Sequence, residues 1–119
     1  MSKLIAVYGT LKRGFGNHRI MGNSEFLGGH LTDPKFTMLS AGGFPIVITK
    51  GSTPIKIEVF KVPDEQINRI NNLEGYSGTR GHRDNWYDTI DVETPYGLAE
   101  MFVMDENPHN LPIVASGEW

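Results

Sequence analysis

The 119-residue chain contains no cysteine. It therefore forms no disulfide, offers no thiolate nucleophile and cannot bind zinc through sulfur. Its four histidines are dispersed, with no H-x-H or H-x₃-H pair, so a metal site would have to be built from loop residues such as His82 and Asp84. Chemistry in this chain is expected to come from oxygen and nitrogen groups.

Long apolar segments are also missing. No run approaches the about 18 residues that indicate a membrane-spanning helix. The apolar stretch near the N-terminus is five residues long before Gly9 interrupts it, which is too short for the core of a signal peptide. With 39% hydrophobic and 21% charged residues, the composition is that of a globular chain. We expect a single domain over residues 1–119, cytoplasmic and without a membrane partner.

Positive charge is scarce in the second half of the chain. Residues 1–60 carry seven Lys and Arg against three Asp and Glu, whereas residues 61–119 carry four against eleven. A duplex-binding domain usually offers a basic face and a high pI, and the pI here is about 5.7. We therefore expect no nucleic-acid partner. The acidic half leaves open a structural or protein-interaction function.

Glycine and proline are frequent, with fourteen and seven residues, and they divide the chain into short segments rich in β-branched and aromatic residues. This pattern is typical of short strands joined by turns. Strands are predicted over residues 4–8, 26–31, 36–39, 45–49, 55–62, 86–94 and 98–104. The aromatic residues Trp86, Tyr87 and Phe102 are predicted to be core and rim residues.

One clear helix is predicted over about residues 64–73. Pro63 fixes a helical φ at its start, and Asp64 places negative charge in the first turn, where the helix dipole favours it. Apolar residues recur at every third position, and Gly75 stands where the helix should stop. We therefore predict an α+β fold: a small, mostly antiparallel, closed β-barrel of about six short strands, with this main helix and short helical turns.

The segment Tyr8-Gly-Thr-Leu-Lys-Arg-Gly14 directly follows the first predicted strand. A glycine at this place lets the chain turn so that successive N–H groups converge into a donor site for a carboxylate or an oxyanion. Thr10 adds a hydroxyl, and Lys12 and Arg13 add positive charge. An ordinary polar turn with solvated basic residues is the alternative. The glycine patterns of phosphate-binding loops are absent.

Glu74 stands at the C-terminal end of the predicted helix, four residues after Ile70 and on the side of the apolar stripe. The helix dipole disfavours a carboxylate there, and burial would add to this effect, so both raise its pKa toward the range that a general acid or base needs. The alternative is an exposed, solubilising glutamate. A serine-based triad is not indicated, because no G-x-S-x-G occurs.

The Tyr8–Gly14 segment, followed by Asn17-His18-Arg19, resembles the γ-glutamylcyclotransferase superfamily and most closely its γ-glutamylamine cyclotransferase branch. Further matches follow in the family's order over roughly residues 4–104. They are residues 44–48, 57–60 and 63–65, the pair Leu73-Glu74, and residues 99–103.

This resemblance implies an enzyme that converts a γ-glutamyl amine or amide into 5-oxoproline and the free amine, without a metal or an organic cofactor. It implies that Tyr8, Gly9, Thr10 and Leu11 line the substrate pocket and that Glu74 transfers protons. The partner would be a small γ-glutamyl molecule, and the chain a monomer or weak dimer. The alternative is a non-catalytic binding module for a γ-glutamyl or other carboxylate-bearing metabolite, in which Glu74 orients the ligand's amine.

Three positions depart from the family pattern. Asn71 stands where relatives often have aspartate, Asp88 where arginine is common, and Met104 where an aromatic is frequent, so a hydroxyl would be missing from the pocket wall. The loop between Glu74 and Trp86 also looks longer than in the amine-specific branch. These departures bear on the substrate more than on the reaction type. We expect γ-glutamyl amines or an isopeptide to be preferred over glutathione.

Overall fold

A computed structural model describes residues 1–119 and shows seven strands, one α-helix and one short 3₁₀ helix. In chain order the elements are β1 (Ser2–Val7), η1 (His18–Met21), β2 (Glu25–Leu31), β3 (Phe36–Ser40), β4 (Pro45–Thr53), β5 (Lys56–Pro63), α1 (Asp64–Glu74), β6 (Asp88–Thr94) and β7 (Gly97–Val103). Each strand predicted from the sequence is present, with its ends shifted by a few residues. The predicted helix is confirmed and ends one residue later than expected, at Glu74.

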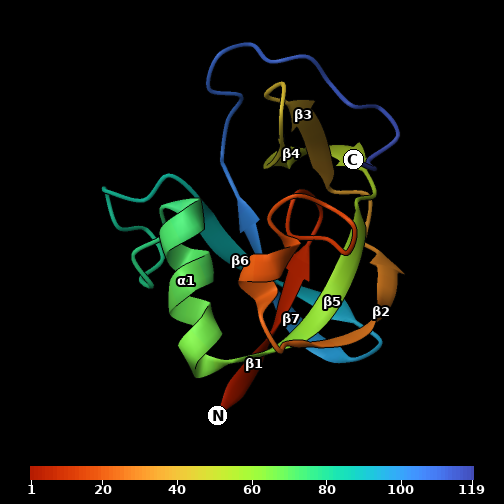
Figure 1. Ribbon diagram of the computed structural model, residues 1–119. Coiled ribbons are helices and arrows are strands. Elements are labelled where there is room, and N and C mark those ends of the chain that lie inside the picture. The colour runs from red at the N-terminus through yellow and green to blue at the C-terminus, as the bar shows by residue number, and fades with distance from the viewer.

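The strands form two separate sheets. Five strands pair in the order β2-β5-β1-β7-β6, and β3 pairs only with β4 in a hairpin. All pairs are antiparallel except β1 with β7, which run parallel. Figure 1 shows α1 beside the larger sheet and the hairpin at one end of the molecule. The prediction of an α+β fold with mostly antiparallel strands is therefore confirmed.

The larger sheet does not close into the barrel that the sequence predicts. Its edge strands, β2 and β6, do not pair with each other. The only ladder pairing between the hairpin and the end of β7 is an isolated bridge between Ile48 and Met104, the residue after β7. Tyr96, in the turn between β6 and β7, packs on Gly28 of β2 so closely that a Cβ at Gly28 would overlap the Tyr96 hydroxyl.

The second half of β1, Ile5 to Val7, is buried on both faces, as its continuous apolar sequence predicts. Ile5 and Val7 pack into the same apolar cluster as Ile70 of α1. Ala6 packs into a second cluster with Met101 of β7. The end of β1 therefore lies deep in the molecule, which fixes the position of the loop that follows it.

The segment after β7 arches over the hairpin (Figure 1). The N–H of Val114 donates to the carbonyl of Met38 at 2.8 Å, and the N–H of Ser40 donates to that of Pro112 at 2.9 Å. These bonds cover the edge of β3. The chain has no helix of the length and hydropathy needed to span a membrane.

Candidate functional site

A cavity of about 520 Å³ opens where the loop after β1 meets the C-terminal end of α1. Segments far apart in the sequence form its wall: residues 6–11, 17, 43–45, 72–75, 86–87 and 102. Tyr8, Gly9, Thr10 and Leu11, which were predicted to bind substrate, all line it, and so does Glu74. The structure thus brings the predicted donor loop and the predicted proton-transfer group into one cavity.

The loop after β1 holds backbone donors without partners. The N–H groups of Gly9, Thr10 and Leu11 donate to no acceptor within the chain. The loop is nevertheless fixed, because the N–H of Lys12 donates to the Gly9 carbonyl at 3.0 Å. Asn17 donates through its Nδ2 to the Thr10 Oγ1 at 2.9 Å and through its N–H to the Thr10 carbonyl at 3.0 Å. Three unpaired amides therefore belong to residues that line the cavity.

Gly9 is required for its size rather than for a left-handed backbone. Its φ is not positive. A Cβ on Gly9 would lie 2.7 Å from Cγ and 2.8 Å from Cδ of Pro45, the first residue of β4. The sequence suggested that Gly9 is needed to let the chain turn, and this reason is corrected. The absence of a side chain instead allows the loop after β1 to contact Pro45 of β4.

The positive charge predicted for this loop does not reach the cavity. The Lys12 Nζ donates to the carbonyl of Trp119 at 3.2 Å. The N–H of Arg13 donates to Glu58 at 2.8 Å, and its guanidinium lies 3.5 Å from the centre of the Phe26 ring. Neither basic side chain lines the cavity. This loop therefore brings no charged side chain to the cavity.

A tight cap holds Glu74 at the last position of α1. Gly75 adopts a left-handed φ of 64°. Its N–H donates to the Asn72 carbonyl at 3.3 Å, and the N–H of Tyr76 donates to the Asn71 carbonyl at 2.9 Å. These two bonds form the Schellman motif, which satisfies the last carbonyls of a helix. The side chain of Glu74 is thereby carried on a rigid helix end at the cavity wall.

The Glu74 side chain is partly buried and no group of the chain forms a hydrogen bond or ion pair with it. Burial raises the pKa of Glu74 to about 7, because loss of water disfavours the ionised carboxylate. The alternative of an exposed, solubilising glutamate is thus wrong. A carboxyl group in this state can both accept and release a proton near neutral pH.

Two tyrosine hydroxyls lie in the same wall. The Tyr8 hydroxyl donates to the Phe102 carbonyl at 2.7 Å, whereas the Tyr87 hydroxyl lies 3.5 Å from the Pro45 carbonyl. Burial raises the pKa of both phenols, and the negative charge of Glu74 adds to the effect. Both therefore stay protonated while Glu74 titrates. The long contact of Tyr87 leaves its hydroxyl available to a ligand.

Sequence reasoning missed Tyr87 as a site residue and treated it, with Trp86, as a core or rim aromatic. The loop between α1 and β6 brings both to the cavity. The N–H of Trp86 donates to the Gly75 carbonyl at 2.8 Å, which ties the end of the loop to the helix cap. The one sequence signal was position, since both residues directly precede a strand after a long polar loop.

The three departures from the family pattern lie outside the cavity wall. The backbone N–H of Met104 donates to the Val47 carbonyl at 2.9 Å, so Met104 joins the end of β7 to the hairpin. Asp88 accepts the N–H of Gly81 at 3.1 Å and so shapes the loop before β6. No three His, Asp or Glu side chains come close enough to hold a metal ion, and His82 and Asp84 stand as a pair at 3.9 Å.

Comparisons with known proteins place the chain in a family. The sequence model of the family described as "Gamma-glutamyl cyclotransferase, AIG2-like" matches residues 5–119. The "Gamma-glutamylcyclotransferase family protein YtfP" of Escherichia coli K12 is 30% identical over 115 residues, which cover 97% of this chain and 94% of YtfP. A Vibrio cholerae protein is 29% identical over 119 residues, covering 100% of this chain and 96% of its own length.

The fold agrees with a solved structure. The crystal structure of protein PH0828 from Pyrococcus horikoshii matches with a TM-score of 0.78 and 28% identity, over 98% of this chain and 89% of that one. The superfamily resemblance drawn from the Tyr8–Gly14 segment is confirmed. The chain belongs to the Gamma-glutamyl cyclotransferase, AIG2-like family.

Proposed function

We propose that the protein is a cyclotransferase that converts γ-glutamyl amines or amides into 5-oxoproline and the free amine. One observation carries this proposal: a carboxyl group with a pKa of about 7 shares a cavity with three unpaired backbone amides. A relative named as a γ-glutamylcyclotransferase family protein supports the same reaction type.

The substrate supplies its own nucleophile. Its α-amine attacks the carbonyl carbon of its side-chain amide, so that a C–N bond closes a five-membered ring and the C–N bond to the leaving amine breaks. Water is neither consumed nor released, and the two products together have the composition of the substrate. Glu74, as the carboxylate, accepts the proton that the α-ammonium must lose. Once protonated, it donates that proton to the leaving nitrogen.

The backbone amides of Gly9, Thr10 and Leu11 act on the charges of the reaction. The tetrahedral intermediate carries a negative oxygen, and the α-carboxylate of the substrate also needs donors. Loss of one well-placed donor typically costs about 3 kcal/mol of transition-state stabilisation. The Tyr87 hydroxyl, which makes only a long 3.5 Å contact with the Pro45 carbonyl, is a further donor in the cavity wall.

The cavity favours an amine as the leaving group. None of its lining residues is lysine or arginine. The leaving portion of glutathione carries a carboxylate, which would find no cation there, and desolvating an unpaired charge is costly. We therefore expect γ-glutamyl amines or an isopeptide to be turned over faster than γ-glutamyl amino acids and glutathione. This order agrees with the resemblance to the γ-glutamylamine branch.

A turnover screen tests the reaction and the order together. The protein is incubated with γ-glutamyl amines, γ-glutamyl amino acids and glutathione, and 5-oxoproline is measured directly by mass spectrometry. We expect release from the amines first. Preference for glutathione would overturn the order but not the reaction. Binding of the same compounds with no release of 5-oxoproline would overturn the enzyme and favour a binding module in which Glu74 orients the ligand's amine.

A further inference from the structure

The side chains that line the cavity divide by exposure into an interior and a mouth. Tyr8, Leu11, Tyr87 and Phe102 are each no more than 7% exposed. Three apolar lining side chains, by contrast, face solvent: Phe44 is 43%, Leu73 42% and Trp86 74% exposed. We call these three residues the mouth.

Three exposed apolar side chains border the same cavity, and this arrangement indicates a ligand-binding site. Single exposed apolar residues are ordinary on a protein surface, and Leu31, Leu98 and Ile113 are examples that lie outside the cavity. The mouth differs because its members come from three separate segments and border one opening. Apolar surface gathered in this way marks a binding site more often than chance exposure does.

Each residue of the mouth is held by its backbone. Leu73 lies in the last turn of α1, just before the Schellman cap. Trp86 donates its N–H to Gly75, and its Cβ packs so closely that a Cβ on Gly75 would lie 2.9 Å away. The Phe44 carbonyl accepts the N–H of Ala41 at 2.9 Å, which closes the turn before Pro45. A subsite fixed before the ligand arrives loses less entropy on binding.

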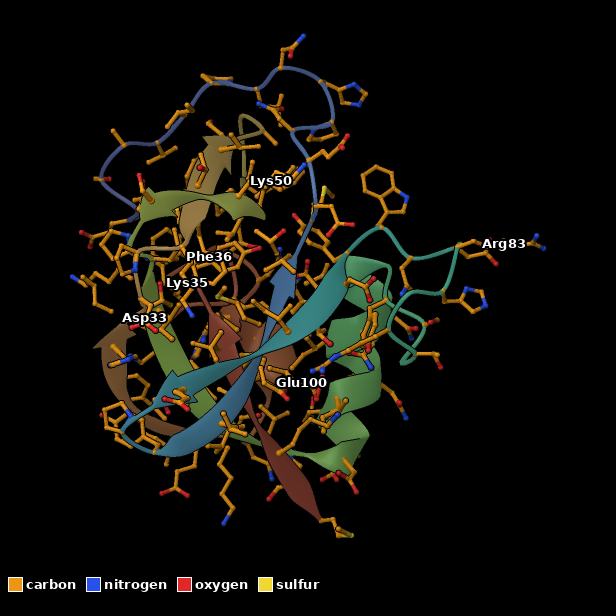
Figure 2. All side chains as sticks on the ribbon, turned by 180° about the vertical axis from the view of Figure 1, so that it is seen from behind. Asp33, Lys35, Phe36, Lys50, Arg83 and Glu100 are labelled. Atoms are coloured by element: carbon orange, nitrogen blue, oxygen red, sulfur yellow. The ribbon has the colours of Figure 1, made fainter.

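The mouth carries no charge. Glu74 is the one acidic residue of the cavity wall, and no basic residue lines it. Arg83 belongs to the same loop as Trp86, but Figure 2 shows it at the outer tip of that loop, directed away from the body of the protein. A carboxylate at the mouth would therefore meet apolar side chains and no cationic partner.

We propose that Phe44, Leu73 and Trp86 form the subsite for the leaving amine and select γ-glutamyl amides of apolar amines, aromatic amines included. This inference rests on the proposed function. With the γ-glutamyl group held inside by Glu74 and the loop amides, the substituent on the departing nitrogen extends toward the opening. There it buries its apolar surface on the mouth until the C–N bond breaks and the amine leaves with the proton from Glu74.

Four substrates test the subsite through the rate of 5-oxoproline release. γ-Glutamylphenethylamide and γ-glutamylphenylalanine differ only by a carboxylate, and γ-glutamylmethylamide lacks the aromatic group of the first. γ-Glutamylglycine completes the set as a small, charged leaving group. We expect kcat/KM for the phenethylamide to exceed that for each of the other three by about tenfold or more, the usual gain from burying an apolar group of this size.

Substitutions at the mouth test whether these residues cause the preference for the phenethylamide. Trp86→Ala and Phe44→Ala are each expected to lower the ratio of kcat/KM for phenethylamide to that for methylamide by about tenfold. Thermal melts identify a variant that fails to fold, in which case the other decides. The matched control is Leu98→Ala, which truncates a 61% exposed apolar side chain of β7 outside the cavity, and it should leave the ratio unchanged.

The outcomes separate the two proposals. Release of 5-oxoproline from all four substrates without preference for the phenethylamide, or a ratio that neither variant lowers, would overturn the subsite and leave the cyclotransferase standing. No release from any of them would overturn the proposed function and the subsite with it.

Discussion

Gly9 and Pro45 touch across the cavity wall, and the contact leaves no room for a side chain on Gly9. A Cβ there would lie 2.7 Å from Cγ and 2.8 Å from Cδ of the Pro45 ring. Gly9 lies near the start of the loop after β1, and Pro45 begins β4, so this contact joins the main sheet to the hairpin. The shape of the cavity depends on it.

A Gly9→Ala substitution should therefore displace one wall of the cavity. We expect it to lower the free energy of unfolding by about 1–3 kcal/mol, as overpacking usually does, and to weaken binding of 5-oxoproline. Gly9→Val, with a β-branched side chain, should abolish binding and turnover. Urea unfolding and calorimetric titration provide the measurements. Gly16→Ala is the control, because a Cβ on Gly16 meets nothing within 4 Å. Wild-type binding by Gly9→Val would show that the loop is not part of the ligand site.

The cap of α1 gives a second prediction. Gly75 has a φ of 64°, and a Cβ on it would lie 2.9 Å from the Cβ of Trp86. Gly75→Ala should cost about 1–2 kcal/mol of stability through backbone strain and should also lower turnover, because it moves Trp86 and Glu74. Gly78→Ala introduces similar strain at a φ of 92°, but its Cβ meets nothing within 4 Å. Equal turnover in the two variants would contradict a link between the cap and the site.

The two tyrosines should respond in opposite ways to removal of the hydroxyl. Tyr8→Phe deprives the buried Phe102 carbonyl of a donor at 2.7 Å, which should cost about 1 kcal/mol of stability. Tyr87→Phe breaks only a 3.5 Å contact, so stability should change little. Turnover should fall further in Tyr87→Phe, by about tenfold or more, because this hydroxyl can exchange its long contact with Pro45 for a hydrogen bond to the substrate. Thermal melts and turnover assays of both variants test this prediction. It is refuted if the variant that loses more stability is also the one that loses more turnover.

The helix and the strands could be predicted from the sequence, because the signals for them lie in residues that are neighbours along the chain. The capping signals around Pro63 and Gly75 and the apolar run after Leu4 are of this kind. The motif of residues 8–11 and Glu74 were also identified correctly as lining one cavity.

Long-range packing could not be predicted in the same way. The five-stranded sheet is open, and Tyr96 packs on Gly28 of its edge strand β2. No pattern near either residue specifies that contact. Tyr87 and Phe44 reach the cavity only through the loop before β6 and the hairpin turn. Met104 was expected in the pocket wall, yet its backbone pairs with Val47 instead.

The stability of the protein should depend on pH through Glu74. Its pKa is about 7 in the folded state against an ordinary value of 4.5, so the folded state retains a proton that the unfolded state releases. The resulting stabilisation is fully present below the lower value and is lost as the pH rises through the higher one. In Glu74→Gln this loss is absent. Relative to that variant, wild type should therefore lose up to about 3 kcal/mol of unfolding free energy between about pH 4 and pH 8. If the difference in unfolding free energy between wild type and Glu74→Gln is the same at every pH, the raised pKa of Glu74 is contradicted.

The central claim is that Glu74 transfers the protons of the cyclisation, and Glu74→Gln tests it most directly. Glutamine keeps the shape of the side chain but cannot take up the proton. The control is Glu65→Gln, an exposed residue in the first turn of the same helix. Turnover of the best γ-glutamyl amine should fall by a factor of about 10² to 10⁴ in Glu74→Gln, while 5-oxoproline still binds and Glu65→Gln stays active. Retention of more than about half of wild-type turnover would contradict the claim, since general acid–base catalysis is worth far more than that.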